Sequence, residues 1–465
     1  MFQHFRISQQ SGTVCRAVVH SRSVRFLTGL AFLSLWGGSS LAAVLCVNTG
    51  GKFGCQASIS AAVAAAVPND TIQVAQGTYK EEVVITKSLS LVAQGNTHPV
   101  IDATGLPNGV FINGMAAAPN PGVAAVVISG FEVRNANFEG ILIANASDIT
   151  IVDNYVHDNN RSLDISSPAC PGIPAFETNE GEDCGEGIHL MAADHSSILR
   201  NDVESNSGGI LISDETGVNH DNLISGNSVH DNPYDCGITL ASHGPATSVI
   251  PSAKLPFGVM RNVISHNDSS HNGYQTPGAG AGVGIFAPFP GTTDSANVVL
   301  DNELRDNGLP GVTMHNHAAA PAPAPPVNLN DNVIVGNIIS GNAADTADAA
   351  TSGPTGINVH SVAPIFGTVI SQNIFDDEAI DVAFKAPMGQ VSAHFNSFSR
   401  KATGVDNLGS GTVDATENWW GCPFGPNGNS CASIAGTEVL FAPWLTSPFE
   451  DGNQDHGNQD HQGNH

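Results

Sequence analysis

The chain of 465 residues contains few basic and few aromatic residues. Lysine and arginine together number 16, against 43 aspartates and glutamates, so the formal net charge is −27 at pH 7. Such a surface repels nucleic acid and anionic membranes, and it would repel a polyuronate unless Ca²⁺ bridged the two. Aromatic residues make up only 6% of the chain, whereas glycine contributes 50 residues. This composition favours many short strands and tight turns over a helical core.

The amino end has the features of a targeting segment. Four arginines precede an apolar run at 26–36, and residues 40–42 form a small-x-small cleavage site. We predict a cleaved signal peptide at 1–42, with an uncleaved anchor running to Val47 as the alternative. Cleavage removes four arginines and no acid, which takes the formal net charge from −27 to −31. The protein is then expected to be secreted, periplasmic or at the cell surface, with no membrane contact beyond export.

Cysteine is also scarce, with eight residues in the chain. Close spacing near the two ends and in one inserted segment predicts disulfides in an oxidising compartment. The expected pairs are Cys46–Cys55, Cys422–Cys431 and, as the preferred pairing of an odd trio, Cys170–Cys184. The third member of that trio, Cys236, lies two residues before Ile238 on an expected strand. We predict that it points into the core as a small hydrophobe.

An asparagine-centred pattern recurs through the chain. The stretch at 151–156 shows it: an aliphatic residue, two variable residues, an asparagine, one variable residue and another apolar residue. The first series is Asn154, Asn201, Asn227, Asn267, Asn302, Asn337, Asn373, Asn396 and Asn418. A second series, five residues later, is Asn159, Asn206, Asn232, Asn272, Asn307 and Asn342. The shortest spacing, 22 residues, indicates a basic unit that carries insertions elsewhere, which is typical of a solenoid.

Asparagine suits the turns of a solenoid, because it tolerates tight-turn backbone conformations and its amide can bond to stacked neighbours. At 128–133 the same pattern recurs with Phe131 in place of the asparagine. From Asp70 to Trp444 the chain resembles the right-handed parallel β-helix proteins, which include pectate-lyase-like and NosD-like repeat proteins. The resemblance implies an all-β fold, a right-handed parallel β-helix solenoid of about ten coils with an N-terminal helical cap.

Local patterns predict how the ends of the solenoid are built. The Ala-rich segment 57–67 is expected to form a short helix with Ile59, Val63 and Val67 on one face, capping the open end. Short strands are predicted at 71–74, 82–85 and 88–92. At the other end, the aromatic residues of 415–422 are expected to cover the last strand edge. The resulting organisation is a cap at 43–70, a β-helix domain at 71–449 and a disordered Asp/His-rich tail at 450–465.

A second signature, glycine followed by aliphatic, variable and aliphatic residues, accompanies the ladder. It begins at Gly140, Gly187, Gly209, Gly237, Gly282, Gly311 and Gly356. Because residues two apart share a face of a strand, the aliphatic residues should point inward and the variable residues should line an outer face. Inserted residues follow several of these strands, and another insertion spans 161–184. Loops grouped along one flank would wall a groove, where solenoids usually bind their ligands.

Titratable residues gather in one column when these strands are stacked in register. Neighbouring coils lie about 4.8 Å apart, so Asp214 or Glu215 should lie near His243. His189 should lie beside them and His315 about two coils further on. The predicted catalytic residues are therefore Asp214, Glu215, His243, His189 and His315. The predicted substrate-binding residues are Phe286, His317, Asn316 and Asp235, of which Asp235 has turn support as its alternative role.

Three chemistries fit this column. In uronate elimination or C5 epimerisation, a histidine removes the C5 proton while Asp214 and Glu215 hold Ca²⁺. A glycosidase needs two carboxylates, and these two should point apart, so Asp235 or Glu177 would have to be the partner. A Zn²⁺ or Cu²⁺ site on the histidines and Asp214 is the third possibility, although these histidines show no His-x-x-x-His spacing.

We predict an exported, monomeric, carbohydrate-active protein that binds a polysaccharide in the loop-walled groove. Lyase or C5-epimerase chemistry is favoured because histidines dominate the column, with Ca²⁺ as the cofactor considered. Paired aspartate motifs of the polygalacturonase kind and an Asp-Pro-His motif of the alginate-epimerase kind are both absent. Glycoside hydrolysis by paired carboxylates is the alternative enzyme. A non-catalytic glycan-binding or structural surface protein is the alternative from another class.

Overall fold

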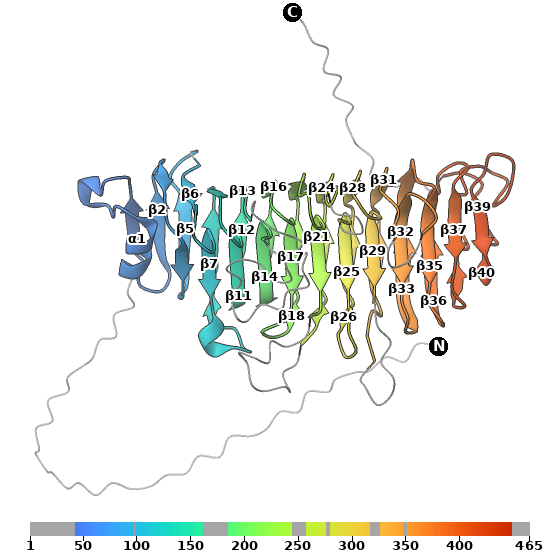
Figure 1. The fold of residues 1–465 in the computed structure, drawn as a ribbon, viewed down its shortest axis with the longest axis horizontal. Coiled ribbons are helices and arrows are strands. Elements are labelled where there is room, and N and C mark those ends of the chain that lie inside the picture. Colours follow the sequence, from blue (N-terminus) through green and yellow to red (C-terminus); the bar gives the residue numbers. More distant parts are fainter. Residues whose placement is uncertain are drawn as a thin grey trace, which may run out of the picture. The chain divides into compact units, whose positions relative to one another are not determined.

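The structure is a computed structural model that describes residues 42–448, apart from Thr97 and the segments 161–184, 244–256, 276–279, 317–325 and 347–350. Within these residues, short parallel strands stack coil upon coil along one axis, from the blue end to the orange end of Figure 1. The coils build three sheets, named A, B and C here. The predicted signal peptide, the tail at 450–465, Glu177 and His317 lie outside the described residues.

Each sheet gathers one strand position from successive coils. Sheet A has 14 strands: β1 (Val44–Val47), β2 (Asp70–Val74), β5 (Leu89–Ala93), β9 (Val126–Ser129), β12 (Thr150–Val152), β15 (Ser197–Leu199), β19 (Leu223–Ser225), β23 (Val263–Ser265), β27 (Val298–Leu300), β30 (Val333–Val335), β33 (Ile365–Ser371), β36 (Gly389–His394), β38 (Thr412–Asp414) and β40 (Val439–Leu440). Sheet B has ten: β3 (Thr78–Tyr79), β6 (Val100–Asp102), β10 (Glu132–Arg134), β13 (Tyr155–His157), β16 (Asp202–Glu204), β20 (Ser228–His230), β24 (Asp268–Ser270), β28 (Glu303–Arg305), β31 (Ile338–Ser340) and β34 (Ile374–Asp376).

Sheet C has 16 strands in the described part of the chain, and it carries the insertions. They are β4 (Val83–Ile85), β7 (Val110–Asn113), β8 (Val123–Ala124), β11 (Ile141–Ser147), β14 (Ile188–Asp194), β17 (Ile210–Ser213), β18 (Asn219–His220), β21 (Ile238–Ala241), β22 (Val259–Met260), β25 (Val283–Phe286), β26 (Asp294–Ser295), β29 (Val312–His315), β32 (Thr355–His360), β35 (Ile380–Lys385), β37 (Thr403–Asn407) and β39 (Ser433–Gly436). The prediction of about ten coils matches sheet B. Sheet A is longer because the end coils add strands to it without adding one to sheet B.

One continuous apolar core runs inside the coils. The aliphatic residues of the glycine signature, such as Ile188 and Leu190, are fully buried in it, as predicted. The alternate residues of the same strands point to the outer face of sheet C. On that face His189 pairs in register with Leu142 of the coil before and Leu211 of the coil after. The in-register neighbours of His189 are thus two leucines, and the other predicted catalytic residues do not lie in its row.

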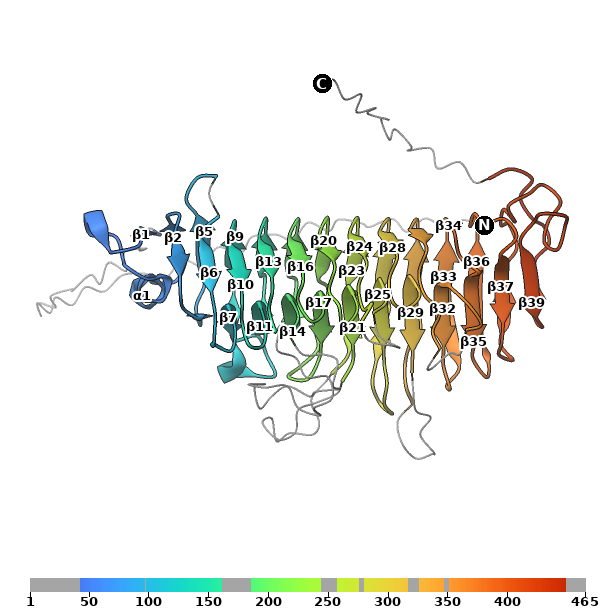
Figure 2. The ribbon, with the colours of Figure 1, turned by 45° about the horizontal axis from the view of Figure 1, so that its top comes forward.

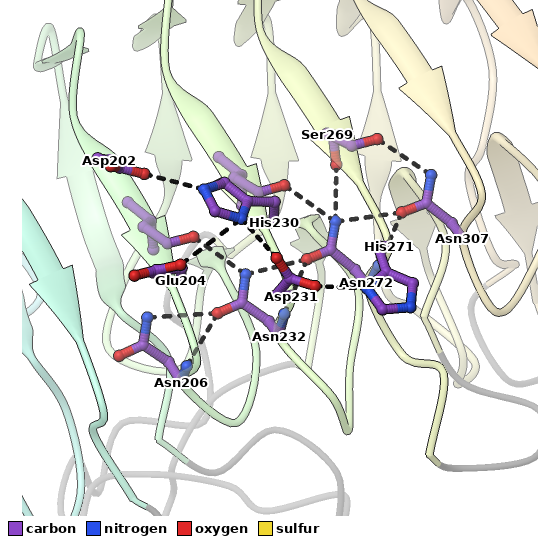
Figure 3. A network of polar contacts seen from close by, with 12 residues as sticks. Asp202, Glu204, Asn206, His230, Asp231, Asn232, Ser269, His271, Asn272 and Asn307 are labelled. Carbon is purple, nitrogen blue, oxygen red and sulfur yellow. Dashed lines mark hydrogen bonds and ion pairs between the residues drawn. The ribbon is translucent and has the colours of Figure 1, made fainter.

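Both predicted asparagine series form ladders at the corners of the coils. In the first, from Asn154 to Asn418, each side-chain amide donates to the next asparagine oxygen at 2.9–3.0 Å. Phe131 begins this ladder, since its backbone N–H donates to Asn154. The second ladder runs from Asn159 to Asn342, and Figure 3 shows its central part. Each buried asparagine amide thus finds its hydrogen-bond partner in the neighbouring coil, and these bonds hold successive coils together.

A third ladder stands at the corner between sheets C and A, and the sequence analysis missed it. It is built from Ser196, Asn222, Asn262, Asn297 and Asn332. These residues precede the first series by five positions, as the second series follows it by five. The residue before each ladder asparagine often has the left-handed backbone, for example Asp221 and Asp301, with φ of 57° and 53°. Aspartate and glycine tolerate this conformation, which explains their frequency there.

The amino end is covered by the predicted helix. α1 (Ile59–Ala65) packs its buried Ile59 and Val63 into the core beside β1, β2 and β4 (Figure 2). Ser58 caps its first turn by accepting a hydrogen bond from the Ala61 N–H at 3.2 Å. The placement of Val67 on the same face was wrong, because the helix ends at Ala65 and leaves Val67 48% exposed. Two short 3₁₀ turns, η1 (Lys52–Gly54) and η2 (Met115–Ala117), complete the helical elements of the described residues.

Two of the three predicted disulfides lie in the described residues, and both form. They are Cys46–Cys55 and Cys422–Cys431, whereas Cys170–Cys184 lies outside those residues. Cys236 is buried, but it packs with Ala281 and Leu309 in a small cluster apart from the main core. At the carboxyl end Trp420 is fully buried, and β39 and β40 follow it, so the coil at 415–422 is not the last.

None of the helices in the described part of the chain has the length and apolar character needed to cross a membrane. The segment Val44–Val47, which the anchor alternative would include, forms β1 and pairs with β2.

Candidate active site

Insertions open sheet C along its middle. In β11 and β14 the strand is seven residues long, but in the next coils it is divided into β17 and β18, then β21 and β22, then β25 and β26. The residues at the points of division are therefore released from strand pairing. Asp214 and Glu215 follow β17 directly, and Ser242 and His243 follow β21. Three of the predicted catalytic residues, Asp214, Glu215 and His243, thus lie where the chain leaves sheet C.

A chain of polar contacts joins three of the five predicted catalytic residues. His189 Nε2 lies 2.7 Å from Ser213 Oγ, and the Ser213 hydroxyl donates to Glu215 Oε2 at 2.5 Å. The other oxygen, Glu215 Oε1, contacts His243 Nδ1. Their side chains are at most 2% exposed. The structure thus places Glu215 against His243, with His189 on the neighbouring coil linked through Ser213.

The charge state of Glu215 is set by these neighbours. Burial disfavours the carboxylate, but the imidazoles of His243 and His189 and the Ser213 hydroxyl outweigh it, so the pKa of Glu215 lies below its usual range. An ionised Glu215 accepts a hydrogen bond from the Ser213 hydroxyl group. The serine oxygen can then accept a hydrogen bond from His189.

Two glutamates that the sequence analysis missed complete this group. His189 Nδ1 lies 3.1 Å from Glu139 Oε1. Glu139, Glu186 and His189 each bring one ligand atom to within 4.8 Å of the others. Both glutamates are buried, with exposed fractions of 0% and 1%. The set Glu139, Glu186, His189, Ser213, Glu215 and His243 is referred to below as the acid–histidine cluster.

The signal for these glutamates was present in the sequence. Each glutamate directly precedes the glycine of the second signature, in the coils that begin at Gly140 and Gly187. The predicted catalytic residues all follow a signature glycine, whereas these two glutamates precede it. A repeated Glu-Gly-Ile at equivalent positions would have identified a pair of carboxylates one coil apart.

Asp235, a predicted substrate-binding residue, lies at the edge of the cluster. Gly208 provides the space between them: a Cβ on Gly208 would lie 3.4 Å from both Asp235 Oδ2 and Glu186 Oε1. Asp235 is 6% exposed and follows the second ladder corner, so it faces the same acidic surroundings. A side chain at this position would come against both carboxylates.

Asp214 points away from Glu215. Its Oδ2 accepts a hydrogen bond from Ser242 Oγ at 2.7 Å, and Ser242 in turn accepts from the Thr293 N–H at 3.0 Å. Burial and the charge of Asp214 raise the pKa of nearby Asp294 well above its usual range. Asp214 and Glu215 follow the end of β17, where the chain turns, and their carboxylates contact Ser242 and His243 respectively. The structure therefore does not bring them together as the predicted Ca²⁺ pair.

His315 lies in a separate polar group further along sheet C. Its Nε2 is 2.9 Å from Asp345 Oδ2 and 2.7 Å from Thr313 Oγ1. The ring of Phe286 stands edge-on to it, with centroids 5.6 Å apart. The Asn316 side-chain nitrogen donates to Ser361 Oγ, and its side-chain oxygen accepts from the Val362 N–H. His315 is therefore two coils from His243, as predicted, and does not join the acid–histidine cluster.

A metal ion would find its donors at the two glutamates rather than at Asp214. Glu139, Glu186 and His189 offer two carboxylates and an imidazole within reach of one ion. Carboxylate oxygens suit Ca²⁺, and a mixed carboxylate–imidazole set suits Zn²⁺. His189, however, is already engaged by Glu139 and Ser213. The residues present thus fit Ca²⁺ on the glutamates best.

Comparisons with known proteins agree with this architecture. Residues 108–251 match the family described as the right-handed beta helix region. The crystal structure of the Dettilon tailspike protein is similar at 13% identity, over 86% of this chain and 68% of that chain, with a TM-score of 0.51. A search of curated proteins finds no match. The chain is a right-handed parallel β-helix repeat protein.

Two enzyme structures show weaker similarity. The catalytic unit of a GH87 α-1,3-glucanase from Streptomyces thermodiastaticus strain HF3-3 has 13% identity over 84% of this chain and 66% of that chain, with a TM-score of 0.44. An alginate lyase from Paenibacillus sp. str. FPU-7 has 13% identity over 86% of this chain and 99% of that chain, with a TM-score of 0.33.

Proposed function

We propose that this right-handed parallel β-helix repeat protein is an exported polysaccharide-active enzyme that cleaves a glycosidic bond at the acid–histidine cluster. The observation that carries the proposal is the pairing of Glu139 and Glu186 beside His189 on consecutive coils. Buried titratable groups with converging side chains are costly to keep, and such clusters concentrate at functional sites. Their place on the sheet face opened by insertions supports binding of a long, chain-like substrate there.

Hydrolysis is the chemistry that the paired glutamates support best. Retaining glycosidases place two carboxyl groups about 5 Å apart, and ligand atoms of Glu139 and Glu186 lie within 4.8 Å of each other. The contact with His189 holds the Glu139 carboxyl group in place, and we assign to Glu139 the attack on the anomeric carbon. Glu186 then donates its proton to the departing oxygen, and later removes a proton from the water that releases the sugar.

The other members of the cluster act on the first pair rather than on the sugar. His189 is held between Glu139 and Ser213, so its ring cannot rotate without breaking one contact. Ser213 passes this restraint to Glu215, and Glu215 to His243. All of these groups are buried, which strengthens their electrostatic interactions relative to water. A sugar can therefore reach Glu139 and Glu186 only if the chain above them opens locally. Turnover of a polysaccharide would show that such opening occurs.

Elimination or C5 epimerisation of a uronate is the second candidate, favoured by one specific contact. Glu215 and His243 form a carboxylate–imidazole pair at which a base could remove a proton. The acidic sugar would need a cation, and the cluster partners among the described residues are carboxylates, imidazoles and a hydroxyl, with no lysine or arginine. Ca²⁺ held by Glu139 and Glu186 would supply that charge.

The test is a polysaccharide panel with the chain from Ala42 onward. Reducing ends report hydrolysis, and the ultraviolet absorbance of unsaturated uronates reports elimination. We expect reducing ends without that absorbance, and a loss of at least about a hundredfold in Glu139→Gln and in Glu186→Gln. Glu303→Gln, on the outer face of β28, is the matched control and should retain activity. Full activity in both cluster variants would refute the proposal.

A further inference from the structure

A pocket lies at the corner between sheets B and C, outside the acid–histidine cluster. It has a volume of about 260 Å³, enough for one sugar ring, and it spans the turns that follow four successive strands of sheet B, from β13 to β24. The side chains that matter here are Asp158, Ser207, Asp231, Tyr234 and Tyr274. Two of the four tyrosines in the chain therefore line one pocket.

Tyr274 presents a fixed aromatic face to this pocket. It is 45% exposed, and its ring stacks on His271 with centroids 4.2 Å apart and an interplanar angle of 2°. His271 Nδ1 contacts Asp231 Oδ1, and Asp231 Oδ2 lies 2.8 Å from His230 Nδ1 (Figure 3). Tyr274 thus stands at the end of a polar chain that holds it in place. Rigid, partly exposed tyrosines are effective contact surfaces because little entropy is lost when a ligand packs on them.

Ser207 offers an unused hydrogen-bonding group at the same place. Its side chain is 1% exposed, and within the described part of the chain its Oγ has no hydrogen-bond partner. A buried hydroxyl without a partner costs roughly 1–3 kcal/mol, and a hydroxyl-rich ligand in the pocket would remove that cost. Pockets that bind ligands typically combine an aromatic wall with a few such polar groups.

The charge of the pocket selects against acidic sugars. The carboxylates of Asp158 and Asp231 line it. The carboxylate of Asp231 is kept ionised by its histidine neighbours, although burial opposes this, and its pKa lies below the usual range. A uronate or sulfated sugar would meet like charge there, whereas a sugar with hydroxyl or amino groups would find acceptors.

The pocket adjoins the acid–histidine cluster through the backbone. The Ser207 N–H donates to the Gly185 carbonyl at 3.1 Å, and Gly185 directly precedes Glu186. Tyr234 directly precedes Asp235 in the same way. The pocket and the cluster are thus built on adjacent residues of the same coils.

We propose that this pocket is a sugar-binding subsite that takes a pyranose ring without an acidic substituent, with Tyr274 as its stacking platform and Ser207 as a hydrogen-bonding partner. The proposal deepens the proposed function by naming its substrate class, a neutral or amino-sugar polysaccharide rather than a polyuronate, and it rests on that function. It assigns to Tyr274 and Ser207 roles in binding, with no part in bond cleavage.

The test measures binding by calorimetry, using chains of six sugars: maltohexaose, laminarihexaose, mannohexaose, chitohexaose and hexagalacturonate. Glu186→Gln serves as the background, so that cleavage does not interfere. We expect at least one of the first four probes to bind and hexagalacturonate to bind at least about tenfold more weakly, a difference of about 1.4 kcal/mol. Failure of all four to bind, or tightest binding of hexagalacturonate, overturns the subsite.

Variants connect any binding to the pocket. Tyr274→Ala should weaken binding about tenfold or more, Tyr274→Phe should leave it nearly unchanged, and Ser207→Ala should weaken it severalfold. Thermal unfolding checks that each variant is folded. Unchanged binding in Tyr274→Ala overturns the proposal. If binding depends on Tyr274 while Glu139→Gln and Glu186→Gln keep wild-type turnover, the subsite stands and the catalytic assignment falls, so the two failures can be told apart.

Discussion

His189 Nδ1 lies 3.1 Å from Glu139 Oε1, although the two residues are 50 positions apart in the chain. The contact joins neighbouring coils: Leu142 and His189 are partners in the pairing of β11 with β14. It is also the first link of the path through Ser213 to Glu215. Four predictions follow from this path and from the ladders that support it.

Removing the Ser213 hydroxyl should separate His189 from Glu215. In Ser213→Ala we expect kcat to fall about 10- to 100-fold while KM changes less than about threefold, because the lost contacts position charged groups and do not bind substrate. The acidic limb of the pH–rate profile should also move. Ser340→Ala on β31 is the control, since its side chain lies on the outer face of sheet B. A change in KM alone would contradict a positioning role.

A chelator distinguishes the two candidate chemistries. If Glu139 and Glu186 act directly on the sugar, activity should be unchanged after dialysis against EDTA and unaffected by added Ca²⁺. If they hold Ca²⁺ for a uronate substrate, the same treatment should abolish activity and Ca²⁺ should restore it. We expect the first result. Restoration by Ca²⁺ would assign the glutamates to the metal and favour elimination.

The ladders should account for much of the stability of the coils. In Asn302→Ala, the Asn267 N–H and amide lose their acceptor, and the Ile264 carbonyl loses its donor. Leaving these buried groups unpaired should lower the free energy of unfolding by about 2–4 kcal/mol, measured by chemical denaturation. Asn96→Ala, at an exposed site, should change it by less than about 0.5 kcal/mol. Equal effects would show that the ladder bonds contribute little.

Glu378 should make the protein less stable as pH rises. It ends the second ladder by accepting from the Asn342 backbone and side chain at 3.1 and 3.0 Å. Burial raises its pKa to about 7, with Asp377 and Asp306 adding to the shift while the Asn342 bonds oppose it. The unfolded chain releases this proton near pH 4.5, whereas the folded chain keeps it to about pH 7. Stability from this group is therefore complete at low pH and is lost between the two values.

Glu378→Gln removes this dependence while keeping an acceptor for Asn342. The difference in unfolding free energy between variant and wild type should grow by roughly 1–3 kcal/mol in favour of the variant from pH 4.5 to pH 8. Other titrating groups cancel in that comparison. A constant difference over this range would show that Glu378 has an ordinary pKa.

Much of the architecture is determined by residues that act locally. Asparagine at two corner positions and glycine before several strands of sheet C, such as β11, β14 and β17, are demanded by turn conformation and by close approach of neighbouring backbone. A Cβ on Gly209, for example, would lie 2.1 Å from the Gly237 carbonyl oxygen. Because these requirements repeat from coil to coil, the sequence alone determined the fold and two of the ladders.

The composition of the site was decided by the tertiary structure. The repeated Glu-Gly-Ile places Glu139 and Glu186 one coil apart, but sequence spacing does not reveal that their buried carboxylates converge on His189. The direction of a side chain where a strand ends is likewise set by packing rather than by alternation along a strand. Asp214 therefore turned to Ser242, while Glu215 turned to His243. Contacts between coils are nonlocal, and only stacking in three dimensions determines which carboxylates share a site.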